Sequence, residues 1–249
     1  MRFRRSVLIA VLASVLIAPS LFAQTKTVGA DLDTMVLVPA GWFIMGSNDG
    51  DDDMKPQRRV YLDAFYIDKY PVTNSRFRSF EKPMKDYGVK FKEVRQPVVG
   101  VTWFQARDYC KSVGKRLPTE AEWEKAARGA DGRRYPWGNQ WDGSKGIWWE
   151  NSGEKPHPVD RTHNTHRSPF GAVDMSGNVW EWVVDWFKRD YYRNAPNRKP
   201  QGPATGLGRV VRGGSWYGSL PTAFHTAFRG WLQPVTWHDD VGFRCAKAP

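Results

Sequence analysis

Two cysteines carry the most reactive side chains of this 249-residue chain. Cys110 and Cys245 are its only cysteines, and they stand far apart in the sequence. Two thiols that meet in a fold can form a disulfide, whereas free thiols can bind a soft metal ion or act as nucleophiles. Their spacing alone leaves both possibilities open.

Imidazole and carboxylate groups gather near the C-terminus. His225 and His238 lie in one segment, and Asp239 and Asp240 directly follow the second histidine. Such a set can bind Fe(II) or another divalent ion if its members converge. We interpret the two histidines instead as surface or hydrogen-bonding residues, and keep an iron site as the alternative.

Aromatic residues are frequent enough to indicate a folded core. The chain has 13 Trp, 13 Phe and 9 Tyr, too many rings to leave in water, which excludes a disordered protein. A mean hydropathy of −0.59 excludes a multispanning membrane protein. The 23 Gly and 17 Pro indicate a loop-rich fold rather than a helical bundle. The net charge of +11 comes from scattered residues, so nucleic acid is not an expected partner.

The N-terminus has the pattern of an export signal. Arg2, Arg4 and Arg5 precede an apolar run over residues 7–18, which predicts a signal peptide over residues 1–23, cleaved after Ala23. A flexible tail over 24–34 and one domain over 35–249 should follow, in a periplasmic or secreted protein without a membrane anchor. An uncleaved anchor is the alternative. In an oxidising compartment, one disulfide is the simplest state of two cysteines.

Two helices are predicted from their N-terminal signals. Thr102 has Gln105 three residues on, and Thr119 has Glu122 at the same spacing, which is the pattern of a capping box. The residues expected on the buried faces are Phe104, Ala106, Cys110 and Val113 in the first helix, and Trp123, Ala126 and Ala127 in the second.

Short apolar segments predict strands. Residues 35–46 are broken by Pro39 and Gly41, which predicts a hairpin, and residues 59–69 alternate as one strand does. Residues 209–212 and 241–246 predict two further short strands. Thr73 should cap a short helix that buries Phe77 and Phe80.

Seven segments, in order, resemble the formylglycine-generating enzyme, or sulfatase-modifying factor, family. They are VPAG at 38–41 with MGS at 45–47, YPVTN at 70–74, GKRLPTEAEWE at 114–124, YPWG at 135–138, GNVWEW at 177–182, RGGS at 212–215 and GFRC at 242–245. The resemblance implies a single, loop-rich α+β domain with the C-type-lectin-like fold of that family. It also implies that Cys110 pairs with Cys245.

The same resemblance implies that the copper chemistry of the family is absent. Its copper enzymes bind Cu(I) through two cysteines just after the Gly-Gly-Ser segment, and the matching positions here are Gly218 and Ala223. Neither residue has a side chain that can bind a soft metal. We therefore expect no copper and no formylglycine generation.

Structural calcium is the metal that the resemblance favours. The ligands carried over are the side chains of Asp174 and Glu181 and the backbone oxygens of Gly177 and Val179. Carboxylate and carbonyl oxygens are the ligands that Ca²⁺ prefers. The alternatives are an aspartate that caps a turn and a glutamate that pairs with an arginine.

The aromatic loops suggest what such a protein would bind. Trp216, Tyr217, Trp231, Trp237 and His225 belong to the loops in which this family binds its substrate peptide, and core packing is the alternative for the rings. The sequence thus favours a peptide- or protein-binding or accessory maturation factor in the cell envelope, with a periplasmic protein or peptide as partner. An oxidase of different chemistry, either non-haem iron or similar to the relative that matures pyoverdine, and a structural subunit are the alternatives.

Overall fold

The computed structural model describes residues 34–159 and 167–249. The predicted signal peptide and all but the last residue of the predicted tail lie outside this part. Its α-helices are α1 (Asn74–Phe77), α2 (Trp103–Ser112), α3 (Glu120–Arg128), α4 (Trp149–Ser152) and α5 (Tyr191–Asn194). Short 3-10 helices are η1 (Asp52–Met54), η2 (Val89–Phe91), η3 (Gly143–Lys145) and η4 (Pro221–Phe224). Among the helices of the described residues, none is long and apolar enough to cross a membrane.

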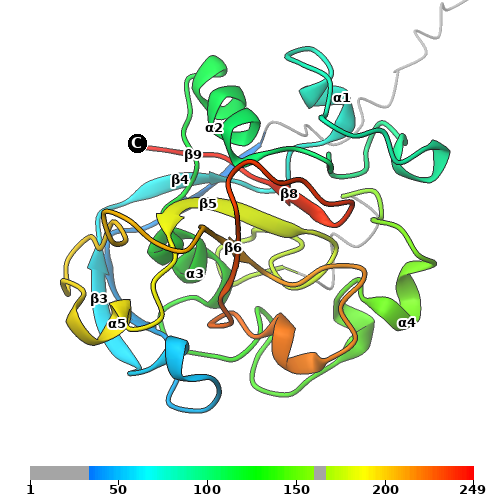
Figure 1. Ribbon diagram of the computed structural model, residues 1–249. Coiled ribbons are helices and arrows are strands. Elements are labelled where there is room, and N and C mark those ends of the chain that lie inside the picture. The colour runs from blue at the N-terminus through cyan, green and yellow to red at the C-terminus, as the bar shows by residue number, and fades with distance from the viewer. Residues whose placement is uncertain (1–33, 160–166) are drawn as a thin grey trace, which may run out of the picture.

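In the described part of the chain, nine short strands form three small sheets (Figure 1). The first has the order β1 (Met35–Val38), β4 (Phe65–Asp68), β9 (Ala246–Lys247), and the second pairs β2 (Gly41–Met45) with β3 (Arg58–Leu62). The third has the order β7 (Gly230–Leu232), β6 (Arg209–Arg212), β5 (Trp180–Trp186), β8 (Val241–Phe243). Only β5 and β8 pair in parallel among these strands.

Helix α3 lies at the centre of the fold (Figure 1). Its Trp123, Ala126 and Ala127 are fully buried, as predicted, and share a core with Phe43 of β2 and Val183 of β5. The helix begins with the predicted capping box between Thr119 and Glu122. The central position of α3 explains why its sequence is apolar on the side that faces the sheets.

Helix α2 confirms its predicted capping box but not its predicted face. Thr102 and Gln105 make the reciprocal cap, and Ala106 and Cys110 are buried. Phe104 is 40% exposed and Val113 is 43% exposed, so these two predictions are wrong. The buried stripe of α2 includes Trp103, Ala106, Tyr109 and Cys110. Phe104 follows Trp103 by one residue and therefore points about 100° aside, whereas Val113 is the C-cap residue, at which the helix has already ended.

The predicted hairpin over residues 35–46 is wrong. β1 pairs with β4, where Val38 lies opposite Phe65, and β2 pairs with β3, where Gly41 lies opposite Leu62. The strand predicted over 59–69 is likewise two strands. Both segments change sheet at a two-residue break, which a local apolar pattern does not reveal. In α1, Phe77 is buried as predicted, whereas Phe80 is 37% exposed.

Candidate functional site

The predicted disulfide between Cys110 and Cys245 is confirmed. It joins α2 to the segment between β8 and β9, and both cysteines are fully buried. The thiols are therefore not available for metal binding or nucleophilic chemistry in this state, and the described residues include no free cysteine.

Glu181, a predicted calcium ligand, has an arginine partner. Arg244 donates from Nε and Nη2 to the two carboxylate oxygens of Glu181, at 2.7 Å each, and Trp123 donates its indole N–H to Oε2 at 2.8 Å. All three side chains are buried. A calcium ion at Glu181 would have to share or displace these donors.

Asp174, the other predicted carboxylate ligand, orients a turn. Its Oδ2 accepts from the Asn178 side chain at 2.9 Å, and Asn178 in turn bonds the backbone N–H and carbonyl of His157. Asp174 and Asn178 both have positive φ angles, 59° and 70°. No three acidic, imidazole or thiol groups gather as metal ligands in residues 34–159 and 167–249. Calcium at Asp174, Gly177, Val179 and Glu181 stays a prediction.

The two C-terminal histidines have different surroundings. His225 packs edge-on against Tyr135 with the ring centroids 5.0 Å apart. Burial, followed by the charges of Arg134 and Arg128, lowers the pKa of His225 below its ordinary value. His238 is exposed. Asp240 accepts from the Ser215 hydroxyl at 2.7 Å, and burial raises the pKa of its carboxyl. An iron site at these residues stays an alternative only.

The predicted aromatic surface divides into buried and exposed rings. Trp216 is 5% exposed and packs with Val99, Ile147 and Val179, which is the core-packing alternative. Its indole N–H donates to the Asp239 carbonyl at 3.1 Å. Its ring is therefore fixed in place behind the surface.

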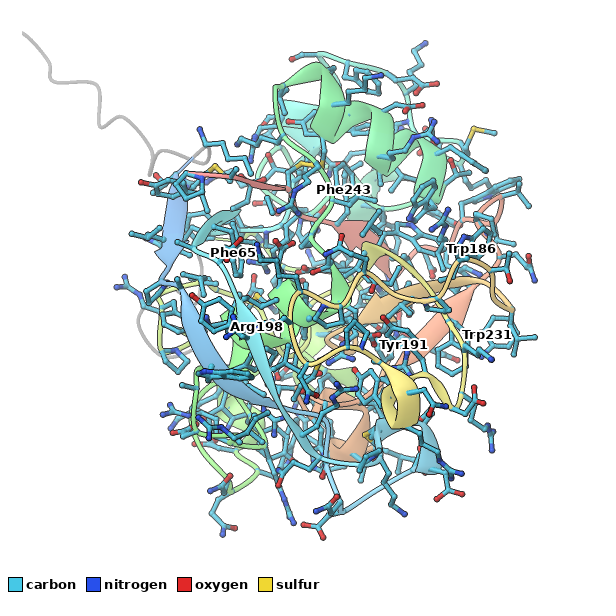
Figure 2. All side chains as sticks on the ribbon, turned by 90° about the vertical axis from the view of Figure 1, so that its left-hand side faces the viewer. Phe65, Trp186, Tyr191, Arg198, Trp231 and Phe243 are labelled. Atoms are coloured by element: carbon cyan, nitrogen blue, oxygen red, sulfur yellow. A yellow bond between two sulfur atoms is a disulfide. The ribbon has the colours of Figure 1, made fainter. Side chains whose placement is uncertain are left out.

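Trp231 and Trp237 are partly exposed, at 41% and 39%. Trp231 stacks on Phe187 with an interplanar angle of 24°, on the side of the molecule where Trp186 lies (Figure 2). Tyr217 contacts Trp149 instead, so Tyr217 and Trp231 belong to two separate ring clusters.

Gly218, the position matched to the first copper thiol, lies near three exposed apolar residues, two on its own loop and one on α4. Tyr217 is 61% exposed, Leu220 on the same loop is 66% exposed, and Trp149 of α4 is 49% exposed. The rings of Trp149 and Tyr217 meet edge to face, with their centroids 5.6 Å apart. The backbone N–H of Trp149 donates to the Gly218 carbonyl at 3.1 Å. We call Trp149, Tyr217 and Leu220 the rim patch.

Sequence reasoning missed two residues of the rim patch. Trp149 lies far from Tyr217 in the sequence, and only the fold brings α4 to this loop. The available signal was the pair Trp148-Trp149, because the side chains of two consecutive residues point in different directions in a helix or a strand. Trp148 contacts Trp141 and Phe224, whereas Trp149 is exposed.

A buried charge network lies beneath the loops and was also missed. Glu120 binds Arg212 and Arg229 at 2.7 Å, and Arg212 also binds Glu124. Burial alone would raise the pKa of Glu120, but Arg229 and Arg212 outweigh it and hold the pKa below its ordinary value. Asp185 accepts the Glu120 backbone N–H at 2.8 Å. Burial, followed by the charge of Glu120, raises the pKa of Asp185 to about 8.

Asp185→Asn should make stability less dependent on pH. Between pH about 4 and 8 the unfolded chain loses the Asp185 proton while the fold keeps it, so the free energy of unfolding falls as pH rises. Asparagine keeps an acceptor for the Glu120 N–H but has no proton to lose. Urea unfolding measures the free energy of unfolding of the variant minus that of the wild type. This difference should increase by roughly 1 kcal/mol or more between pH 5 and pH 8. Exposed Asp190→Asn is the control, and an equal change in both variants would contradict the prediction.

Comparisons with known proteins agree on one fold. A family model described as "Sulfatase-modifying factor enzyme 1-like domain" matches residues 21–249. The formylglycine-generating enzyme of Streptomyces coelicolor is 34% identical, with 85% of this chain and 88% of that enzyme covered. The serine/threonine-protein kinase pkn1 of Chlamydia caviae is 37% identical over 86% of this chain, which spans only 38% of the kinase. The structure of PvdO from Pseudomonas aeruginosa has a TM-score of 0.71 at 26% identity, with 86% of this chain and 94% of PvdO covered. The predicted single, loop-rich α+β domain is confirmed.

Proposed function

The chain belongs to the sulfatase-modifying factor enzyme 1-like family, and from this premise we propose that it is a copper-independent member that binds a peptide or protein in the cell envelope. The family resemblance matches Gly218 and Ala223 to the two copper thiols, and a soft metal ion gains no ligand from either side chain. The proposal assigns the chain a binding or accessory role in the maturation of its partner.

The rim patch is the observation that carries this proposal. Large apolar side chains that meet at an exposed surface are typical of binding sites, and Trp and Tyr often anchor such interfaces because they bury much area with few rotatable bonds. Trp216 supports the patch from beneath, since its buried ring packs on Tyr217 at 5.5 Å. A fixed ring behind an exposed one reduces the conformational entropy that binding must remove.

The purified protein should not convert a cysteine-containing sulfatase peptide to formylglycine, with or without added copper. The physical reason is the missing thiol pair at Gly218 and Ala223. Mass spectrometry of the peptide after incubation measures the outcome, with the Streptomyces coelicolor formylglycine-generating enzyme as the positive control. A mass loss that matches conversion of the thiol to an aldehyde would overturn the copper-independent assignment.

Photo-crosslinking at Tyr217 should identify the partner. Benzoylphenylalanine in place of Tyr217 should give one defined protein adduct in the envelope fraction, and the same group in place of Trp42 should not. Trp42 is a suitable control because it is also an exposed ring, at 39%, but lies on β2.

Binding of the identified partner should then depend on the rim patch. Trp149→Ala and Tyr217→Ala should each cost about 2 kcal/mol of binding free energy, whereas Trp42→Ala should leave the affinity unchanged. Circular dichroism checks that all variants fold. Unchanged affinity in both rim variants would place the partner elsewhere, as expected for a structural subunit that docks through another face.

A further inference from the structure

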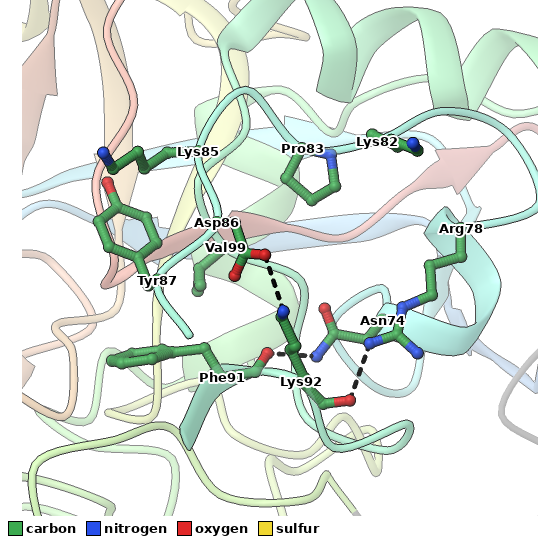
Figure 3. Close-up of a pocket in the computed structure, with 10 residues that line it drawn as sticks. All are labelled: Asn74, Arg78, Lys82, Pro83, Lys85, Asp86, Tyr87, Phe91, Lys92 and Val99. Atoms are coloured by element: carbon green, nitrogen blue, oxygen red, sulfur yellow. Dashed lines mark hydrogen bonds and ion pairs between the residues drawn. The ribbon is translucent and has the colours of Figure 1, made fainter. Parts of the chain in front are cut away.

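A cavity of about 290 Å³ lies between the segment that follows α1 and the 3-10 helix η2 (Figure 3). It is distinct from the rim patch. Phe91 in its wall packs on the buried ring of Trp216 at 5.9 Å, and Trp216 in turn packs on Tyr217. One buried ring therefore stands between the cavity wall and the rim patch.

The charges around this cavity are strongly unbalanced. Arg78, Lys82, Lys85 and Lys92 line it, with Asp86 as the single carboxylate. Lys92 neutralises Asp86 through an ion pair at 2.7 Å, and Lys82 and Lys85 form no ion pair with any described residue. Three positive charges therefore remain without a carboxylate, which makes the cavity attractive to an anion.

The walls between these charges are apolar. Tyr87 and Phe91 present rings whose centroids are 5.7 Å apart and whose planes are tilted by 53°, and Pro83 and Val99 complete the apolar lining. Both rings are partly exposed to the cavity rather than fully buried. A planar apolar group can pack against such a pair of rings.

The Arg78 guanidinium is already held in place at the cavity. Its Nη2 donates to the Lys92 carbonyl at 2.8 Å, and the Asn74 amide fixes the neighbouring backbone by donating to the Phe91 carbonyl at 2.8 Å (Figure 3). A guanidinium fixed by one hydrogen bond keeps its other N–H groups in a fork that suits an anionic group.

We propose that this cavity binds a small organic anion in which one aromatic ring carries an anionic group such as phosphate. The ring packs against the cavity side of Tyr87 and Phe91, and the anion lies in the positive field of Arg78, Lys82 and Lys85. The volume lies at the small end of the range for ligand pockets, which matches one ring and its substituent. This assignment is independent of the proposed function.

Calorimetric titration with phenyl phosphate tests the proposal, with inorganic phosphate and phenol as separate halves of the probe. Phenyl phosphate should bind at least about tenfold more tightly than either half, because only the whole probe uses both the rings and the charges. Lys82→Gln/Lys85→Gln should weaken that binding by about tenfold. The matched control is Lys111→Gln/Lys247→Gln, which removes the same charge away from the cavity and should change the affinity less than about twofold.

Asp86→Asn should strengthen the binding of phenyl phosphate, whereas the lysine variants should weaken it. Asparagine can still accept the Gly88 N–H that Asp86 Oδ1 accepts at 2.8 Å, but it removes the only carboxylate of the lining and releases Lys92. Binding of phenyl phosphate should therefore become about threefold tighter. Equal affinities for phenyl phosphate and inorganic phosphate, or equal losses in the lysine variants and their control, would overturn the proposal.

Discussion

Glu181→Gln should destabilise the domain by about 3–5 kcal/mol. Three donors converge on the Glu181 carboxylate, two from Arg244 and one from Trp123, and glutamine offers them one oxygen and an NH₂ group that repels a donor. Arg244 would then keep a buried charge without its counter-ion. Such a charge has no access to water, so its desolvation cost is not recovered.

The other contacts of Arg244 cannot replace that counter-ion. Its Nη1 donates to the carbonyls of Asp68 and Lys69, and its Nη2 also donates to the Val173 carbonyl at 2.7 Å. These three carbonyls are neutral acceptors, and they lie on two separate segments. Arg244 thereby ties the end of β4 and the segment before β5 to the segment between β8 and β9. Glu181 supplies the only carboxylate among its partners in the described residues.

Urea unfolding in EDTA and in excess calcium separates the ion pair from the predicted calcium site. The loss caused by Glu181→Gln should persist in EDTA, because Arg244 needs its partner whether or not calcium is present. Exposed Glu154→Gln, which removes a surface ion pair with Lys90, is the control and should cost less than about 1 kcal/mol. If the variant matched the wild type in EDTA and differed only in calcium, metal binding would be the role of Glu181. A wild type stabilised by calcium would support the predicted site.

Local signals were sufficient to place the N-termini of helices α2 and α3. Thr102 with Gln105 and Thr119 with Glu122 are close in sequence, and the capping boxes they predict are present. The hairpin prediction was wrong because β1 and β2 do not pair with each other. β1 pairs with β4 and β2 pairs with β3, and these partners lie more than a dozen residues away in the sequence. Strand pairing of this kind is set by tertiary packing and not by the pattern of one segment.

The loop that carries the rim patch could be picked out from the sequence, but the members of the patch could not. The loop with Tyr217 was identified, yet residue type could not distinguish the exposed Tyr217 from the buried Trp216 beside it. Trp149 joins the rim patch only through the arrangement of α4 against the loop. Glu181 was predicted as a calcium ligand, with an arginine partner as the alternative. That the arginine is Arg244, in a different segment, is shown only by the fold.

Removing the disulfide by Cys110→Ala/Cys245→Ala should cost about 5 kcal/mol of stability. The bridge closes a sequence separation of 135 residues, and a loop of that length restricts the unfolded chain strongly in the chain-entropy model. Typical domains are stable by only about 5–15 kcal/mol, so the loss is a large fraction of the total. Alanine is the suitable replacement because both positions are fully buried and a hydroxyl there would need a partner.

Urea unfolding with and without dithiothreitol measures this contribution twice. Reductant should lower the midpoint of the wild type to nearly that of the double alanine variant, and it should leave the variant unchanged because no thiol remains in it. A wild-type midpoint that does not respond to complete reduction would show that packing around α2 and β8 holds these segments together without the bridge. A strong response would instead make folding depend on an oxidising compartment, which is the condition that the export predicted from residues 1–23 would supply.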